Sequence, residues 1–280
     1  MKNRESHRGS LYLCATPIGN LGDITVRALE TLRACDLIAA EDTRRTRRLL
    51  SHYDIHTPMM SYREENREAA GLRIIKRIEE GAVVALVSDA GTPGISDPGH
   101  DLVKRCLERE LEVEALPGAN AAVTALVLSG LPTLRFSYEG FLPRKKGARR
   151  RVLEELATDA RTLIFYESPS RVTETLNDIH DVMGDRDLAL SRELTKRYEE
   201  VLRGAVSEVA ELLESKPVRG EVVLVVKGAG KAAEPSSEEA LERVMRLRGQ
   251  GASLKDAVNR VAVELPGISR RRLYNAALKD

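Results

Sequence analysis

Short apolar runs and helix-period patterns alternate along this chain from residue 10 to residue 227. Strands separated by helices of about ten to fifteen residues are typical of α/β proteins with a largely parallel sheet, because parallel neighbours need a long crossover connection. The sequence therefore predicts an α/β fold with mostly parallel sheets. The expected strands are 11–15, 36–40, 82–87, 113–116, 136–140, 162–166, 188–192 and 221–227.

Each helical pattern between these runs predicts one buried face. Residues 43–51 are expected to form a basic helix, and 119–128 a helix of small residues. Asp23 is placed to cap the first helix. The helix expected before the basic one should bury Val26, Leu29 and Leu32. The helix expected after it, 66–79, should bury Leu72, Ile75 and Ile78.

Composition shifts divide the chain into three parts. A stretch rich in Pro, Gly and charge at 132–147 separates an N-terminal lobe, 1–132, from a second lobe, 133–229. Small and polar residues at 228–237 predict a linker. A small helical extension, 237–280, follows, with helices expected at 237–248, 253–264 and 268–279 in a helix-turn-helix-like arrangement, and with Ser253 and Asp256 at a helix start.

The composition excludes several classes of protein. No apolar stretch approaches the ~18–20 residues of a membrane span, and the polar start is not a signal peptide, so the chain is expected to be cytoplasmic. Cys14, Cys35 and Cys106 form no CxxC pair, and the five histidines show no metal spacing, so no metal site is expected. The cysteines are interpreted as buried small apolar residues.

The net charge of +1 does not indicate a nucleic-acid-binding protein, but two local runs are strongly basic. They lie at 44–48 (RRTRR) and 144–151 (RKKGARRR). Each is explained either by a solvated helix face or by contacts with phosphate groups.

Three glycine-bearing loops each follow an expected strand: 16–20 (TPIGN), 89–94 (DAGTPG) and 117–121 (PGANA). Ligands of open parallel sheets bind beyond the carboxyl ends of the strands, where glycines let backbone N–H groups approach closely. None of the loops is GxGxxG or a nucleoside-triphosphate loop. Together they predict a small ligand held by backbone contacts, with Asp89 placed to bind a ribose diol.

Polar residues at other strand ends allow functional and structural interpretations. Asp42 and Ser168 are equally explained as helix N-caps, and Glu193 as the partner of a neighbouring arginine in a surface ion pair. Asp97 is interpreted as a cap or turn former.

Six motifs, in order, resemble the ribosomal RNA methylating, 2′-O-ribose branch of the tetrapyrrole methylase superfamily. They are 15–23 (ATPIGNLGD), 40–44 (AEDTR), 88–99 (SDAGTPGISDPG), 139–143 (EGFLP), 165–169 (FYESP) and 192–196 (RELTK). The sequence departs from the pattern at Ser170, where a histidine is usual, and at 61–66, which is less rich in histidine.

The resemblance implies a two-lobed α/β methylase, usually a homodimer formed around helices of the first lobe. It implies binding of S-adenosylmethionine between the lobes and methylation of a decoding-centre cytidine ribose in 16S rRNA of the small ribosomal subunit. By motif position, the residues expected to bind the cofactor are Pro17, Gly19, Asp89, Gly91, Ile95, Ser96, Ala121, Ala122, Tyr166, Leu194 and Thr195.

Methyl transfer from a sulfonium requires alignment, exclusion of water, and a base or a cation at the acceptor hydroxyl. The candidates for this catalytic role are Glu41, Asp42, Glu167 and Lys196. Arg44, Arg149, Arg150 and Arg151 are expected to contact RNA phosphates. Two rival functions are a tetrapyrrole C-methyltransferase of the same superfamily and a non-catalytic, ribosome-associated RNA-binding protein. The residues leave open which group acts as base and whether the substrate is free rRNA or an assembled subunit.

Overall fold

The computed structural model describes residues 9–216, 218–230, 237–265 and 268–278. The chain divides into two compact units. The first comprises Met1–Leu156 and Arg161–Lys227, and the second comprises Ala157–Ala160 and Gly228–Asp280. The linker expected at 228–237 lies partly outside the described residues, because 231–236 are not described.

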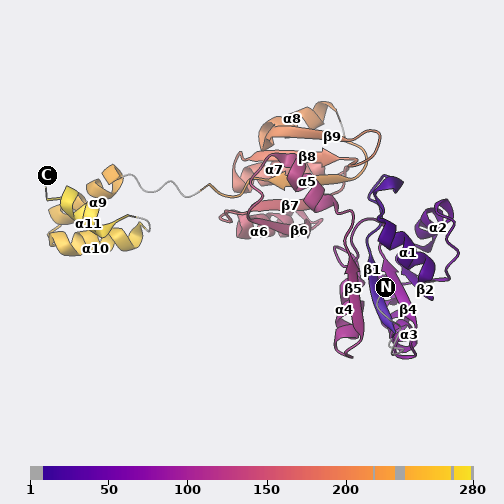
Figure 1. Ribbon diagram of the computed structural model, residues 1–280. Helices are drawn as coiled ribbons and strands as arrows, with labels where there is room; N and C mark the ends of the chain where they lie inside the picture. Colours follow the sequence, from indigo (N-terminus) through magenta and orange to yellow (C-terminus); the bar gives the residue numbers. More distant parts are fainter. Residues whose placement is uncertain (1–8, 217, 231–236, 266–267, 279–280) are drawn as a thin grey trace. The chain divides into compact units, whose positions relative to one another are not determined.

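The first sheet is entirely parallel, as the sequence predicts (Figure 1). Its order is β3-β2-β4-β1-β5. Helices on both faces bury the alternating residues of its strands. The strands are β1 (Ser10–Cys14), β2 (Leu37–Ala40), β3 (Met59–Ser61), β4 (Val83–Val87) and β5 (Glu112–Leu116).

Helices α1 (Val26–Ala34) and α2 (Thr43–His52) pack on one face of this sheet, while α3 (Arg67–Glu79) and α4 (Gly99–Leu107) pack on the other. Short 3₁₀ turns at Leu21–Asp23 and Glu64–Asn66 precede α1 and α3. The carboxyl ends of the parallel strands consequently share one edge, which carries all three glycine loops.

Three expectations about these helices are wrong in detail. Asp23 lies in the 3₁₀ turn, and Thr25 caps α1 by accepting a hydrogen bond from the amide of Ala28. Val26 and Leu72 are 72% and 54% exposed. Ala28 and Ile74, two residues further along in each case, belong to the buried stripe instead.

The second sheet is mixed, which corrects the expectation of mostly parallel sheets. Its order is β6-β7-β10-β8-β9, and only β6 and β7 are parallel; the other pairs are antiparallel. The strands are β6 (Phe136–Phe141), β7 (Thr162–Glu167), β8 (Asp187–Arg192), β9 (Glu200–Ala205) and β10 (Val222–Val226). The short connection between β8 and β9 explains their antiparallel pairing, since a parallel pair would need a crossover.

Helix α5 (Ala121–Ser129) packs on one face of the second sheet, against Ile164, Ala189 and Val225. The remaining helices of the first unit are α6 (Lys146–Leu156), α7 (Val172–Met183) and α8 (Val206–Ser215). Helix α7 lies beside both α6 and α8. Helix α7 also contacts the end of β7, through the hydrogen bond from the Thr175 hydroxyl to Glu167.

The second unit holds three helices, α9 (Ser237–Gly249), α10 (Leu254–Glu264) and α11 (Arg270–Ala276), drawn in yellow in Figure 1. They bury a small apolar cluster that includes Val244, Val261 and Leu273. Ser253 caps α10 by accepting from the amide of Asp256, as expected. Among the described residues, no helix is both long and apolar enough to cross a membrane.

Candidate active site

A cavity of about 410 Å³ lies in the first unit and is lined from both of its sheets. Its size falls within the range of small-molecule sites. Of the residues expected to bind a cofactor, Asp89, Gly91, Ile95, Ser96, Ala121 and Tyr166 line it. The sequence reasoning missed other lining residues, namely Ile18, Arg45, Asn120, Phe141 and the strand start 220–223.

The first two glycine loops are joined through their backbones at this cavity. The amide of Thr16 donates to the carbonyl of Gly91 at 2.9 Å, and the amide of Gly91 donates back at 3.0 Å. Gly91 has φ +81°, and a Cβ at that position would lie 3.3 Å from Cγ2 of Ile18. A side chain is therefore disfavoured by both conformation and space, and this part of the wall is bare backbone.

Asp89 ties the end of β4 to the end of β2. Its Oδ1 accepts from the amide of Asp42 at 2.9 Å, and its own amide donates to Oε2 of Glu41 at 3.1 Å. Arg45 Nη1 lies 3.4 Å from Asp89 Oδ2. The two acidic motifs found in the sequence thus meet at one edge of the sheet.

A second, wider basin of about 860 Å³ adjoins the cavity. Glu41, Ser96 and Asp97 line both spaces. The other residues lining the basin are mostly charged, and they include Asp42, Arg44, Arg63, Glu64 and Glu65. A small ligand in the cavity and a larger polar ligand in the basin would therefore meet at these three shared residues.

Glu41 is the half-buried carboxyl at this junction. Burial raises its pKa, and the charges of Asp89 and Asp97 raise it further. The hydrogen bond from the Asp89 amide and the charge of Arg45 act in the opposite direction without cancelling the shift. A carboxyl with a raised pKa is a better proton acceptor than an ordinary one when it is ionised.

Asp42 is the N-cap of α2, as one of its two interpretations predicts. Its Oδ1 accepts from the amide of Arg44 at 2.8 Å, and its Oδ2 lies 3.1 Å from Arg44 Nη2. The hydrogen bond from the Arg44 side chain lowers the pKa of Asp42 to about 2. Such a carboxylate is a weak base, which leaves Glu41 as the better proton acceptor.

The loop that closes the cavity is held by Ser96 and Asp97. Ser96 has φ +64°, and its Oγ lies 2.6 Å from the hydroxyl of Tyr138. Asp97 accepts from the amides of Gly94 and Gly99 at 2.8 Å, which confirms its interpretation as a turn former. A non-glycine residue in the left-handed region is uncommon and is often found at functional sites.

Aromatic rings form the wall supplied by the second sheet. Tyr166 packs edge-to-face against Tyr138, with centroids 5.0 Å apart, and against Phe141, at 5.6 Å. Burial raises the pKa of Tyr166, so its phenol is neutral across the ordinary pH range. This wall is apolar apart from hydroxyl groups and suits the flat face of a ligand ring.

Residues 10–210 match the family model of the Tetrapyrrole (Corrin/Porphyrin) Methylases. The chain belongs to the tetrapyrrole methylase family. The resemblance found in the six motifs is thereby confirmed.

This methylase is similar over nearly its whole length to proteins named Ribosomal RNA small subunit methyltransferase I. It is 47% identical to the one from Halalkalibacterium halodurans, over 98% of each chain. It is 45% identical to the one from Bacillus subtilis, over 98% of this chain and 96% of the relative.

Solved structures share the fold of this methylase at low sequence identity. Cobalt precorrin-4 methyltransferase matches 80% of the chain and 97% of its own, with a TM-score of 0.59 and 15% identity. Uroporphyrin-III C-methyltransferase from Thermus thermophilus, complexed with S-adenosylhomocysteine, matches 78% of the chain and 97% of its own, with a TM-score of 0.55 and 19% identity.

In this methylase the carboxylate of Glu167 is not open to a substrate. The residue is 3% exposed, and its oxygens accept from the amide of Ser168, the hydroxyl of Thr175 and the guanidinium of Arg171. These donors take three of the roughly four acceptor sites of the carboxylate, so little of its basicity is left for a substrate, although the residue is part of the cavity lining. This bonding favours a structural role for Glu167 over the catalytic role expected of it. Ser168, in turn, does not cap α7, whose N-cap is Arg171.

Lys196 lies beside Gly19, where a Cβ would come within 2.5 Å of Lys196 Cγ. Partial burial lowers its pKa, but hydrogen bonds to Glu193 (2.9 Å) and Glu221 (3.2 Å) outweigh burial and raise it. Lys196 is therefore a paired cation and not a base. The ion pair expected of Glu193 exists, with this lysine as its partner and not an arginine.

Five expected cofactor residues lie near the cavity without lining it: Pro17, Gly19, Ala122, Leu194 and Thr195. Ala122 and Leu194 belong to the apolar cluster that also contains Ile18 and Tyr166. Thr195 has φ +64°, and its buried hydroxyl has no hydrogen-bond partner within the described part of the chain. A single sequence identifies these motifs as a group but does not separate the lining residues from those behind them.

The two basic runs have different surroundings. On α2, Arg44, Arg47 and Arg48 are exposed and border a shallow hollow with Ser51. On α6, Arg149 is only 1% exposed and pairs with Asp178 at 2.7 Å, so the phosphate contact expected of Arg149 is wrong. Arg150 is half-buried between Asp178 and Asp181, and Arg151 is exposed.

Proposed function

We propose that this methylase transfers a methyl group from S-adenosylmethionine to a ribose 2′-hydroxyl of 16S rRNA. The observation that carries the proposal is the junction of an enclosed cavity with a wide charged basin at Glu41, Ser96 and Asp97. The names of the full-length relatives support small-subunit rRNA as the substrate. The acceptor that we propose is a decoding-centre cytidine, as the motif resemblance implies.

The residues around the cavity fit this cofactor. When bound, S-adenosylmethionine supplies an electrophilic methyl group on a positively charged sulfur. The carboxylates of Glu41 and Asp89 suit a cation and a ribose diol. The aromatic wall and the bare backbone at Gly91 suit a flat, polar-edged base, since its ring can stack and its edge can bond to the backbone.

Glu41 is the proton acceptor that we propose for the acceptor hydroxyl. It lines both spaces, and its raised pKa makes its ionised form a stronger base than an ordinary carboxylate. A hydroxyl seated at the junction would lie near this group while the aromatic wall excludes water. Asp89 and Arg45 hold the end of β2 in place.

The RNA backbone is proposed to follow α2. Arg44 lines the basin and also borders the hollow with Arg47 and Arg48, so basic side chains continue outward from the methyl-transfer junction. Within the described residues, neither Arg47 nor Arg48 has a carboxylate at ion-pair distance. Unpaired arginines can bind phosphate without first breaking an ion pair.

A homodimer in the cytoplasm is the assembly and location that we propose. Apolar side chains on the surface of the first unit support self-association, among them Val123 (49% exposed), Val127 (69%) and Leu134 (94%). Light scattering coupled to size-exclusion chromatography gives the mass directly. Charged substitutions at Val127 and Leu134 are expected to convert a dimer to a monomer, and a monomeric wild-type protein would refute this assembly.

The decisive experiment is transfer of labelled methyl to small ribosomal subunits that lack the modification, followed by nuclease mapping. Free rRNA and a porphyrinogen serve as parallel substrates. Label on one cytidine ribose supports the proposal, whereas label on the porphyrinogen alone, or none with any substrate, refutes it. Glu41→Gln is expected to lower kcat by about 10²-fold or more. The wild-type kcat should fall as the pH drops through the raised pKa of Glu41.

A further inference from the structure

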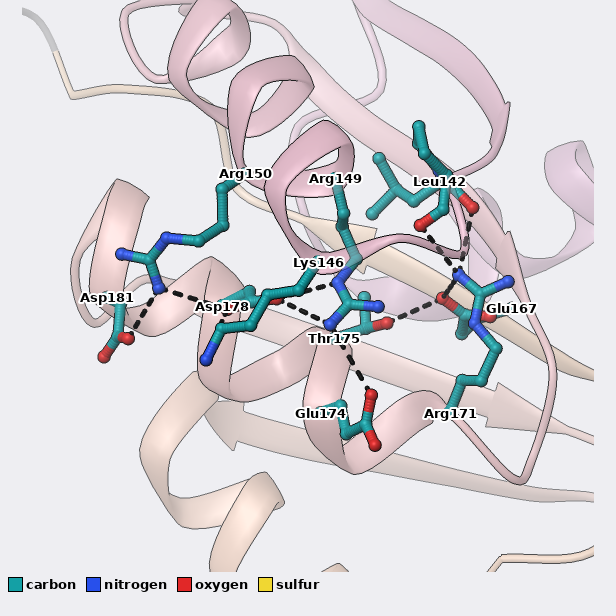
Figure 2. A network of polar contacts seen from close by, with 11 residues as sticks. Leu142, Lys146, Arg149, Arg150, Glu167, Arg171, Glu174, Thr175, Asp178 and Asp181 are labelled. Atoms are coloured by element: carbon teal, nitrogen blue, oxygen red, sulfur yellow. Dashed lines mark hydrogen bonds and ion pairs between the residues drawn. The ribbon is translucent and has the colours of Figure 1, made fainter.

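We infer that Glu167, Arg171 and Thr175 form a buried clamp that positions the aromatic wall of the cofactor cavity; this inference rests on the proposed function. Glu167 is then a positioning residue, acting through Phe141 and Tyr166 and not on the substrate. Figure 2 shows the clamp between the end of β7 and helix α7.

The carboxylate of Glu167 receives donors from both sides of the β7–α7 connection. Ser168, the next residue, donates through its amide at 2.7 Å. Thr175, one turn into α7, donates through its hydroxyl at 2.7 Å, and Arg171 donates through Nη2 at 3.2 Å. The side chain is 1% exposed, so no water competes for these hydrogen bonds and each is strengthened by its dry surroundings.

Arg171 extends the clamp to the end of β6. The same Nη2 donates to the carbonyl of Leu142 at 2.9 Å and lies 3.4 Å from the carbonyl of Pro143. One guanidinium nitrogen thus joins the chain just beyond β6 to the carboxylate at the end of β7. Lysine is not expected to reproduce this arrangement, since its side chain is shorter than that of arginine and its ammonium is more strongly hydrated than the guanidinium nitrogen it would replace.

The clamp lies in the cavity wall itself, since Glu167 lines the cavity together with Phe141 and Tyr166. Phe141 precedes Leu142, and Tyr166 precedes Glu167. Phe141 is 58% exposed, so packing alone does not hold its ring. The backbone on its carboxyl side is instead held by Arg171, and the geometry of the Phe141–Tyr166 pair depends on that restraint.

The support behind the clamp is itself rigid. Thr175 and Asp178 lie one turn apart on α7, and Asp178 binds the buried guanidinium of Arg149 from α6 at 2.7 Å (Figure 2). Helix α7 is therefore fixed to α6 through the same face that carries Thr175. In metal sites, mutation of the residues that hydrogen-bond to the ligating side chains lowers metal affinity or activity by about 10- to 100-fold. We expect a loss of this order when the residues that hold the aromatic wall are changed.

The test measures binding of S-adenosylhomocysteine to the full chain by calorimetry, alongside kcat. Glu167→Gln and Arg171→Lys are expected to weaken binding about tenfold, with a smaller loss of kcat at saturating cofactor. Thr175→Val keeps the shape but removes the hydroxyl and should weaken binding less, whereas Thr175→Ser should retain wild-type affinity. A general base at this position predicts the reverse: a collapse of kcat with unchanged binding.

Two controls separate positioning from loss of stability. Leu213→Ala, on the buried face of α8, destabilises the same unit away from the clamp and should leave the affinity unchanged. Near-ultraviolet circular dichroism should lose tyrosine signal in Glu167→Gln but not in Leu213→Ala, and the chain has no Trp to obscure it.

The outcomes are distinguishable. Wild-type protein that fails to bind S-adenosylhomocysteine refutes the proposed function. Wild-type affinity in both Glu167→Gln and Arg171→Lys, with the wild type binding normally, overturns the clamp. Should Glu167→Gln not fold, Arg171→Lys and Thr175→Val decide the matter in the same way.

Discussion

Helices α2 and α6 carry similar clusters of arginine, yet their side chains have opposite surroundings. On α2 the guanidinium groups of Arg44, Arg47 and Arg48 are exposed. On α6 the guanidinium of Arg149 is enclosed by the protein and bound to Asp178, and Arg150 shares that carboxylate. The difference arises from α7, which presents Asp178 and Asp181 to α6 from about thirty residues away in the sequence. A run of positive charge indicates a binding surface only when its acidic neighbours in space are known.

Among the variants that test this difference between α2 and α6, Asp178→Ala is expected to have the largest effect, on the stability of the fold. It removes the buried partner of Arg149 and leaves only the exposed Glu174, at 3.6 Å, which costs about 3–5 kcal/mol in the free energy of unfolding. Chemical denaturation measures the loss. The matched control is Asp181→Ala, whose carboxylate is 55% exposed, and it should cost about 1 kcal/mol or less. Equal effects of the two variants would contradict the distinction between the buried and the exposed pair.

The second test concerns the exposed arginines of α2. Replacing Arg47 and Arg48 together by Glu should weaken binding of 16S rRNA about tenfold at moderate salt, because two phosphate contacts are lost. The slope of log K against log salt concentration should fall by roughly 1.5 to 2. Filter binding at several salt concentrations measures both quantities. Affinity for S-adenosylhomocysteine should not change, and unchanged RNA binding would remove α2 from the proposed path.

The third test asks how much of the α6 run still serves RNA. Arg151→Ala removes an exposed charge and is expected to weaken RNA binding about threefold, the effect of one phosphate contact. The same binding assay applies. A loss larger than that of the double α2 variant would reverse the comparison and make α6 the principal contact.

The smallest effect is expected at the exposed pair on α2. Arg44→Ala should return the Asp42 pKa from about 2 toward the ordinary value of about 3.9. Because the folded-state pKa is lowered, this pair stabilises the fold above about pH 4, and its contribution is lost as the pH falls toward 2. Carboxyl resonances followed by NMR titration report the shift. An unmoved pKa would show that the Arg44 side chain does not set it.

Much of the first half of the fold could be predicted from the sequence. The strands 82–87 and 11–15 are apolar throughout, because both faces of a parallel sheet are covered, and β4 and β1 are found there. Glycine and proline mark the loops that follow them. The turn at Asp97 was predictable for a similar local reason, since its side chain bonds to backbone amides within three residues.

The second half was less predictable, because its pairing is not local. Strand β9 reads EVLRGA and lies at a sheet edge, so its only large apolar residues are Val201 and Leu202 and it lacks the apolar run of a buried strand. Strand direction in the second sheet depends on where β10 inserts, which no local pattern records. Glu167 shows a different limit within the site. Its partners Arg171 and Thr175 are only four and eight residues away, but their contact with the carboxylate depends on how the β7–α7 turn folds back.

The place of β10 in the second sheet has a consequence for synthesis of the chain. All five strands of the first sheet are complete by Leu116, so that half can fold while translation continues. The second sheet lacks its middle strand until residue 226 has been made, because β10 separates β7 from β8. Until then both of those strands keep an unpaired, apolar edge that invites association with other chains. Helices α9 to α11 of the second unit come after β10 in the chain, so they are translated only after the strand that completes the second sheet.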